Sequence, residues 1–350
     1  MERAIDELRA LLEALVPPPG LSGHEATGIA GSMTGALQPG ADRVWADPLG
    51  NVIARFGRAD APRRTAVLAH MDTVGFLVKT VEAGGILRAV PVGGVNARAL
   101  PGAAVRVFTA QGAIPGVIGV RSQHLAAPDE APASPDDLYI QVDPADAPQI
   151  EITAPVLYAP QIVNLGERRV AAPYLDNRAG CAVLAALGRG LEDLPDDRAV
   201  YLIATAQEET TCLGALSALR VVAPDRALFI DGTLTYDTPD TRALGAVYLG
   251  GGPVLTAFLY ASGMNGWHAH PGWRAHLLQQ CAAHGIPCQQ DAVRGLMSDA
   301  RAAAQLGIPS VVVGLPMRSK HAPLEMVDLA DLAGALRLIQ IALADPYALP

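Results

Sequence analysis

The chain has 350 residues, 50% of them hydrophobic and 17% charged, which is enough for one large domain or two ordinary ones. The net charge of −9 argues against nucleic acid or an anionic membrane surface as a partner. No run of 18 apolar residues is present, and residues 1–16 carry acids where a signal peptide carries bases. The four cysteines form no C-x-x-C pair, so we expect a cytoplasmic protein with reduced thiols.

The first quarter of the chain predicts a helix over residues 2–15, followed by two strands over 52–56 and 65–69. The second strand contains no charge, and such runs are typical of strands buried on both faces of a parallel sheet. It ends in the triplet His70-Met71-Asp72.

Residues 75–165 differ in character from what precedes them. They are rich in Gly and Pro and contain short alternating runs, such as residues 86–92 and 103–110, with little helical periodicity. Short strands between frequent turns predict a small all-β module. Because an α/β pattern resumes afterwards, we predict an inserted β-rich domain at 75–165 within a catalytic domain formed by 1–74 and 166–350.

The remaining segments alternate between strand and helix, which predicts an α/β fold with a parallel sheet. The expected strands cover 200–203, 227–230 and 310–314. The expected helices cover 180–191, 214–219, 274–284, 299–307 and 328–344. Residues 260–276, which contain His268, His270 and His276, are expected to form a surface loop, with extra metal contacts from these histidines as the alternative.

Polar residues follow these strands at one kind of position. His70 and Asp72 follow one strand, Glu208 and Glu209 follow the next, and Asp231 and His321 follow the last two, while Asp176 opens a helix. Singly, each has a simpler explanation as a core histidine, a helix cap or a turn. Together they should meet at the carboxyl edge of one sheet.

Imidazoles and carboxylates that share a buried place need a cation among them. Mixed His, Asp and Glu ligands suit Zn²⁺, Co²⁺ or Mn²⁺, and two ions about 3.5–4 Å apart serve hydrolases that activate water. Neighbouring side chains on extended backbone point apart, so one of Glu208 and Glu209 can bind metal while the other remains a free base.

Several sequence motifs occur in the order that is typical of one known protein family. They are PGLSGHE, DPLGN, AHMDTVGF, YLDNRAGC, ATAQEET, SDARAAAQLGIPSVVVGLPMR and HAPLE. With them, the chain resembles the glutamyl aminopeptidase family of di-metal aminopeptidases, which form hollow tetrahedral dodecamers. Some members have been labelled endoglucanases, but aromatics at 5% supply no obvious sugar platform. The resemblance implies a three-layer α/β/α zinc-exopeptidase-like catalytic domain with an inserted PDZ-like or barrel dimerisation domain.

The resemblance also implies a role for each candidate. Asp176 would bridge two divalent ions, Zn²⁺ first and Co²⁺ or Mn²⁺ as alternatives. The implied metal ligands are His70 and Asp231 on one side and Glu209 and His321 on the other. Glu208 would be the general base, and Asp72 would orient His70. The implied substrate contacts are Ser298, Asp299 and, from a neighbouring subunit, His124.

These roles predict removal of N-terminal residues from short peptides by a homo-oligomer, built from dimers and possible as a dodecamer. The alternatives are a di-metal deacylase of N-acyl amino acids and a non-catalytic homologue. The chain departs from the family pattern at two places that matter here. Residues 295–299 replace the usual Gly-Gly-Thr-Asp, and Arg318-Ser319-Lys320 replaces an Arg-Tyr pair before the last histidine.

Overall fold

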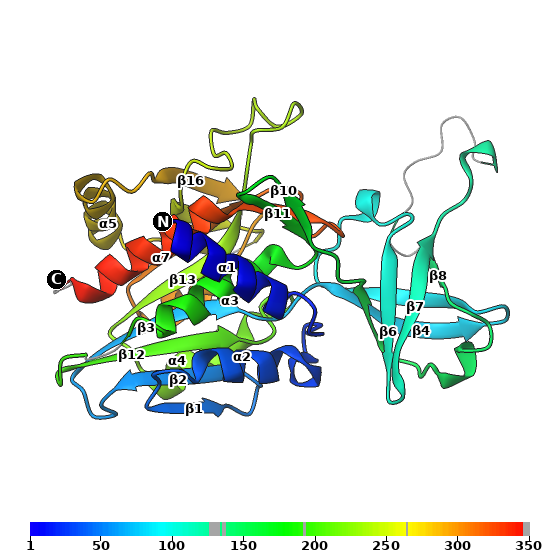
Figure 1. Ribbon diagram of the computed structural model, residues 1–350, viewed down its shortest axis with the longest axis horizontal. Coiled ribbons are helices and arrows are strands. Elements are labelled where there is room, and N and C mark those ends of the chain that lie inside the picture. Colours follow the sequence, from blue (N-terminus) through cyan, green and yellow to red (C-terminus); the bar gives the residue numbers. More distant parts are fainter. Residues whose placement is uncertain (126–133, 135–137, 192–193, 264, 346–350) are drawn as a thin grey trace.

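The computed structural model describes residues 1–125, 134, 138–191, 194–263 and 265–345. A layered α/β body holds most of the chain, and a β-barrel stands beside it (Figure 1). None of the described helices combines the length and the apolar character that crossing a membrane requires.

The body is built on a nine-stranded sheet whose strand order is β1-β2-β12-β3-β13-β17-β14-β15, with β16 paired to β14. The four central strands are parallel: β12 (Arg198–Thr205), β3 (Arg63–His70), β13 (Arg226–Leu234) and β17 (Ser310–Met317). The edge strands are β1 (Arg43–Ala46), β2 (Val52–Gly57), β14 (Val254–Tyr260), β15 (Gly266–His268) and β16 (Gln289–Arg294). Because the central strands are parallel, their carboxyl ends meet at one edge.

Helices cover both faces of this sheet. One face carries α1 (Glu2–Leu15), α2 (Ile29–Leu37), α3 (Leu175–Gly188), α5 (Pro271–Ala283) and α7 (Leu329–Ala344). The other face carries α4 (Leu213–Val222) and α6 (Ala300–Gln305). Every residue of α3 is buried, because this helix lies between the sheet and the outer helices α1 and α7. The predicted three-layer α/β/α architecture is confirmed.

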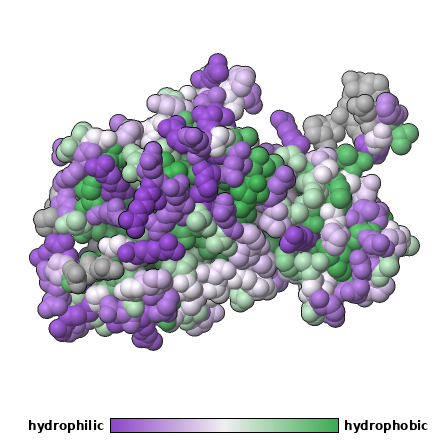
Figure 2. All heavy atoms as spheres, in the orientation of Figure 1, coloured by the Kyte–Doolittle hydropathy of each residue, from purple (hydrophilic) through white to green (hydrophobic). Residues whose placement is uncertain are grey.

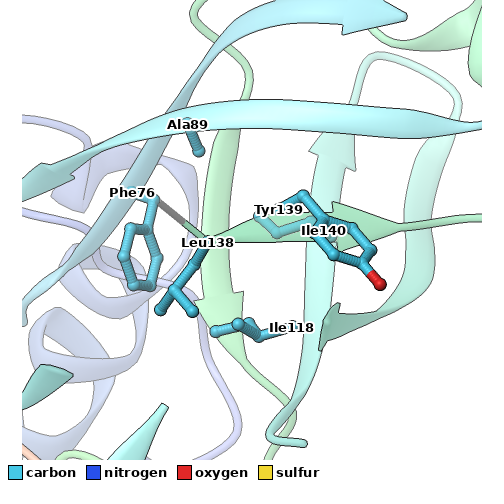
Figure 3. Close-up of a pocket in the computed structure, with 6 residues that line it drawn as sticks. All are labelled: Phe76, Ala89, Ile118, Leu138, Tyr139 and Ile140. Carbon is cyan, nitrogen blue, oxygen red and sulfur yellow. The ribbon is translucent and has the colours of Figure 1, made fainter. Parts of the chain in front are cut away.

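The barrel is formed by six strands in the closed order β4-β5-β8-β7-β6-β9. They are β4 (Gly75–Glu82), β5 (Ile86–Val92), β6 (Ala104–Thr109), β7 (Gly112–Gly119), β8 (Tyr139–Gln141) and β9 (Pro155–Tyr158). Buried and exposed residues alternate along β6 and β7, and the buried ones fill the interior, as expected for a small barrel. Phe76, Leu138 and Ile118 face one another there, and the cavity beside them is only about 10 Å³ (Figure 3).

A three-stranded sheet lies between the barrel and α3. It consists of β10 (Val163–Leu165), β11 (Arg169–Ala172) and β18 (Glu325–Asp328). Short helical turns in the described residues are η1 (Glu25–Thr27), η2 (Ala97–Ala99), η3 (Gln123–Leu125) and η5 (Ala147–Gln149). The central strands also run further than predicted at their carboxyl ends.

Two expectations about elements were wrong. Asp231 lies inside β13 instead of after it, because β13 and β17 stay paired from Asp231 and Gly314 as far as Leu234 and Met317. Within the expected surface loop, residues 266–268 form β15 and residues 271–276 begin α5, and Trp267 and Trp273 are buried on opposite faces of the sheet.

Candidate metal centre and active-site cleft

The five candidate metal ligands meet at the carboxyl edge of the central strands. His70 ends β3, Asp231 lies in β13, and Asp176 lies in the first turn of α3. Asp176 sits between two imidazoles. Its Oδ1 is 3.4 Å from Nε2 of His70, and its Oδ2 is 3.2 Å from Nε2 of His321. This residue therefore connects the two halves of the cluster.

Each half is completed by one more carboxylate. Asp231 Oδ1 lies 3.7 Å from Nε2 of His70, and Glu209 Oε2 lies 3.3 Å from Nε2 of His321. Three sets of possible ligands have their donor atoms within 4.8 Å of one another. These sets are His70–Asp176–Asp231, His70–Glu208–Glu209 and Asp176–Glu209–His321. The first and third sets share Asp176.

Glu208 and Glu209 lie in a turn after β12, not on extended backbone as the sequence argument assumed. The turn nevertheless sends them to different partners. Glu208 Oε2 is 3.8 Å from Nε2 of His70, whereas Glu209 faces His321. The reason is the left-handed backbone of Gln207, at φ 60°, which turns the chain sharply at the end of the strand.

Three carboxylate oxygens in the cluster are buried without a hydrogen-bond partner among the described residues. They are Oδ1 of Asp176, Oε1 of Glu209 and Oδ1 of Asp231. A buried carboxylate oxygen that loses water without gaining a donor is costly, so native structures rarely leave one unpaired. Oxygen and imidazole donors with free lone pairs in this number fit divalent ions of the zinc type.

The pKa shifts describe the same shortage of positive charge. Burial raises the pKa of Glu208 and of Glu209 well above the usual glutamate value, and the neighbouring carboxylates add to this effect while His70 opposes it. Burial by itself would lower the pKa of His70. The carboxylates of Glu208, Asp176 and Asp231 outweigh that effect, so the pKa of His70 is raised well above its usual value. The raised pKa values of Glu208, Glu209 and His70 thus all favour the protonated form of these three groups.

Asp72 contacts the turn that carries the two glutamates. Its Oδ1 accepts a hydrogen bond from the amide of Glu208 at 2.9 Å, and its Oδ2 accepts one from the amide of Glu209 at 3.1 Å. His70 Nδ1 lies closer to the Asp72 carbonyl, at 3.1 Å, than to its carboxylate, at 3.6 Å. The Asp72 side chain thus holds the glutamate turn more directly than it orients the imidazole.

Two residues of the cluster were not assigned a role from the sequence. Buried Glu325 accepts a hydrogen bond from the Asp176 amide at 2.7 Å and one from the His321 amide at 2.5 Å, which ties together two candidate ligands. Its position in the HAPLE motif, four residues after His321, was the available signal. Lys320 was noted only as a departure, yet its ammonium lies 2.9 Å from Asp176.

A cleft of about 290 Å³ opens beside the cluster. Its lining includes Glu208, Glu209, Lys320 and His321 from the body and Gly94 from the barrel. A Cβ atom at Gly94 would stand 3.3 Å from Nδ1 of His321, so the close approach of this loop favours glycine. The barrel therefore contributes one wall of the cleft.

The three predicted substrate contacts lie in different places. Ser298 and Asp299 are buried at the start of α6, and the cleft is lined by their neighbours Leu296, Met297 and Arg301. Thr205 Oγ1 donates to Asp299 at 2.5 Å, and burial raises the pKa of Asp299 to about 7. His124 lies in η3 of the barrel with an exposed side chain, and none of the described ligand sets contains it.

Comparison with known proteins now adds independent findings. Residues 50–338 match the family described as M42 glutamyl aminopeptidase. The lysyl aminopeptidase of Pyrococcus furiosus is 30% identical over 346 residues, covering 96% of this chain and 96% of that protein. The aminopeptidase APDkam598 of Desulfurococcus kamchatkensis superposes with a TM-score of 0.90 at 28% identity, covering 97% of this chain and 95% of that one.

A further solved structure is described as Pyrococcus horikoshii TET1 peptidase, which can assemble into a tetrahedron or a large octahedral shell. It superposes with a TM-score of 0.83 at 27% identity, covering 96% of this chain and 99% of that one. These comparisons define the class of the protein, which is a peptidase, a hydrolase of peptide bonds. More narrowly, the chain belongs to the M42 glutamyl aminopeptidase family, as its motifs predicted.

Proposed function

We propose that this protein is a metal-dependent aminopeptidase that releases N-terminal residues from short peptides. In this proposal, His70, Asp231, Glu209 and His321 hold two divalent ions that Asp176 bridges. The observation that supports it best is the set of buried carboxylate oxygens without hydrogen-bond partners on Asp176, Glu209 and Asp231, which lie near two imidazoles beside an open cleft. Zn²⁺ is our first candidate, and Co²⁺ or Mn²⁺ suit the same donors.

Divalent ions of this kind polarise a carbonyl oxygen and make a water molecule more acidic. Glu208 is placed to use that acidity, because it lines the cleft and lies 3.8 Å from His70 without being needed to connect the two halves. As general base, Glu208 takes a proton from the attacking water and then delivers it to the departing amine. A carboxylate whose pKa is raised by burial is suited to carry that proton.

The cleft also offers a reason for cleavage at N-termini. The carboxylates of Glu208 and Glu209 line it, next to Lys320 and His321. A free α-amino group is cationic or donates hydrogen bonds, so it is favoured there, whereas an acylated nitrogen has lost that charge. N-acyl amino acids, the substrates of the alternative deacylase activity, should therefore be poor substrates.

The experiment compares Glu208→Gln with the native protein on aminoacyl anilides and on N-acyl amino acids. Removing the proton carrier should lower kcat by about 10²–10⁴-fold, while the bound metal, measured by plasma mass spectrometry, stays the same. Glu151→Gln, on the exposed surface of the barrel domain, is the matched control and should behave as the native protein. Retained aminopeptidase activity in Glu208→Gln would sink the assignment, and native turnover of N-acyl substrates alone would favour the deacylase.

We further propose that residues 75–165 form a dimerisation domain and that the dimers assemble into a larger homo-oligomer. Support comes from exposed apolar side chains on this part of the chain, namely Val117, Val120, Leu125 and Ile152. Green atoms are visible on the barrel in Figure 2. The TET1 peptidase, which assembles into shells, has the same fold. A monomer in sedimentation velocity at micromolar concentration would contradict this part.

The proposal places the protein in the cytoplasm, because all four cysteines are free thiols. Cell fractionation tests that location.

A further inference from the structure

Lys320 is an unexpected member of the cluster. It lies in the loop after β17, between Ser319 and His321, whose left-handed backbones have φ values of 56° and 65°. The turn points the lysine side chain into the candidate metal centre, where it is only 9% exposed. Its Nζ lies 2.9 Å from Oδ2 of Asp176 and 3.7 Å from Oδ1 of Asp231, and it donates to the carbonyl of Gly232 at 3.1 Å.

This side chain meets the carboxylates of Asp176 and Asp231 at ion-pair distances. Burial by itself would lower the pKa of Lys320, but Asp176, Asp231 and Glu209 outweigh burial and raise it above the usual lysine value. The lysine thus supplies positive charge to the same carboxylates that would otherwise hold divalent ions.

We propose that Lys320 is a built-in competitor for one of the two ions. Its ammonium takes the place between Asp176 and Asp231, and the second ion binds only after this side chain has left. The inference rests on the proposed function, because it concerns the ligands assigned there. It goes further in making loading of the second ion an exchange between the metal and a residue of the chain itself.

The ammonium and an ion cannot both occupy this place. A zinc-type ion binds a carboxylate oxygen at about 2.0–2.2 Å. Because Nζ is 2.9 Å from Oδ2 of Asp176, an ion on that oxygen would stand no more than about 5 Å from the ammonium. Two like charges at that distance in a buried site repel strongly. Lys320 has somewhere to go, since it already lines the cleft.

The contacts place the ammonium between the two ligand sets. Its Nζ is 2.9 Å from Oδ2 of Asp176, the oxygen that faces His321, and 3.7 Å from Oδ1 of Asp231, the oxygen that faces His70. The second ion should therefore bind only after the lysine has moved, whichever side the first ion takes.

The first test measures binding of Co²⁺ or Zn²⁺ to the metal-free protein by equilibrium dialysis. The native protein should bind one ion tightly and a second at least tenfold more weakly. Lys320→Met should bind the second ion at least tenfold more tightly than the native protein does, with the first unchanged. Lys79 is the only other lysine in the sequence and lies exposed on β4, so Lys79→Met is the matched control and should bind as the native protein.

Equal affinity for the second ion in the native protein and Lys320→Met would overturn the inference while leaving the proposed function intact. Absence of any bound ion in all variants would overturn both together. Lys320→Gln, which keeps a polar side chain, should behave as Lys320→Met does. These outcomes separate a lysine that competes with metal from one that only packs in the loop.

A second test needs no variant. An amine-reactive acetylating reagent should label Lys79 in the metal-free protein and leave Lys320 protected, as peptide mass spectrometry can measure. Saturating Co²⁺ should raise labelling of Lys320 at least fivefold, because the side chain is displaced into the cleft, and leave Lys79 unchanged. If two ions bind while Lys320 remains as protected as before, the exchange does not occur.

Discussion

Asp72 offers the sharpest test of how the cluster is held. It is fully buried, and its two carboxylate oxygens accept the amides of Glu208 and Glu209 at 2.9 and 3.1 Å. In Asp72→Asn, one oxygen becomes an NH₂ group that faces an amide hydrogen. One charge-assisted hydrogen bond is therefore lost, and a buried donor is left without an acceptor.

The expected size follows from that single bond. A hydrogen bond to a charged group contributes about 1.5–3 kcal/mol, so the Glu208 turn loses about that much restraint. If the whole amount is spent in positioning Glu208, kcat falls about ten- to hundredfold. The lost hydrogen bond lowers the free energy of unfolding, whereas removing one negative charge from an acid-rich cluster raises it. The charge removal does not restore the Glu208 turn, so kcat reports the loss of positioning better than stability does.

The matched control is Asp331→Asn. Asp331 is also fully buried, and its two oxygens accept the amides of Gly250 and Gly252 at 2.8 and 2.7 Å, away from the metal ligands. Steady-state kinetics on an aminoacyl anilide, with metal content and unfolding by urea, compares the two variants. Loss of kcat in Asp72→Asn only is the expected result. Values of kcat within twofold of native for Asp72→Asn, or an equal loss in Asp331→Asn, would refute the reasoning.

Two further predictions concern stability. Burial raises the pKa of Asp331 to about 6, so the folded state holds the Asp331 proton at a higher pH than the unfolded state does. The metal-free protein should therefore lose about 2–3 kcal/mol of unfolding free energy as the pH rises from 4 to 6. Asp331→Asn should lack this loss. Identical pH dependence in both proteins would contradict that assignment. Gly214→Ala places a Cβ 2.0 Å from the Ala206 carbonyl and should cost about 1–3 kcal/mol, whereas Gly31→Ala, in open space on α2, should gain about 0.5–1 kcal/mol. Thermal unfolding checks both, and shifts of the same sign would speak against steric crowding at Gly214.

The candidate site residues that the sequence could predict are those that follow the strands of the parallel sheet. His70, Glu208 and Glu209 follow uncharged strands, and side chains at the ends of parallel strands must converge. The order of the motifs then added Asp176 and His321. The inserted barrel was predictable because its short alternating runs break the α/β pattern.

The rest depends on contacts that no local pattern encodes. Glu325 holds the amides of Asp176 and His321, and only the folded chain brings those amides together. Lys320 points inward because the residues on either side of it adopt left-handed backbone, which a sequence without glycine there does not predict. Asp231 lies inside β13 because the pairing with β17 continues past it, a property of two strands far apart in the sequence.

The loop that joins β5 to β6 has a wider consequence. Gly93 and Gly94 approach Glu209 and His321, and the Asn96 amide donates to the His321 carbonyl at 3.3 Å. The inserted domain is thus joined to a candidate ligand by a backbone hydrogen bond and by the close approach of glycine backbone to the His321 ring. A tilt of the barrel would therefore shift His321, which links contacts on the outer surface of the barrel to the geometry of the candidate metal centre.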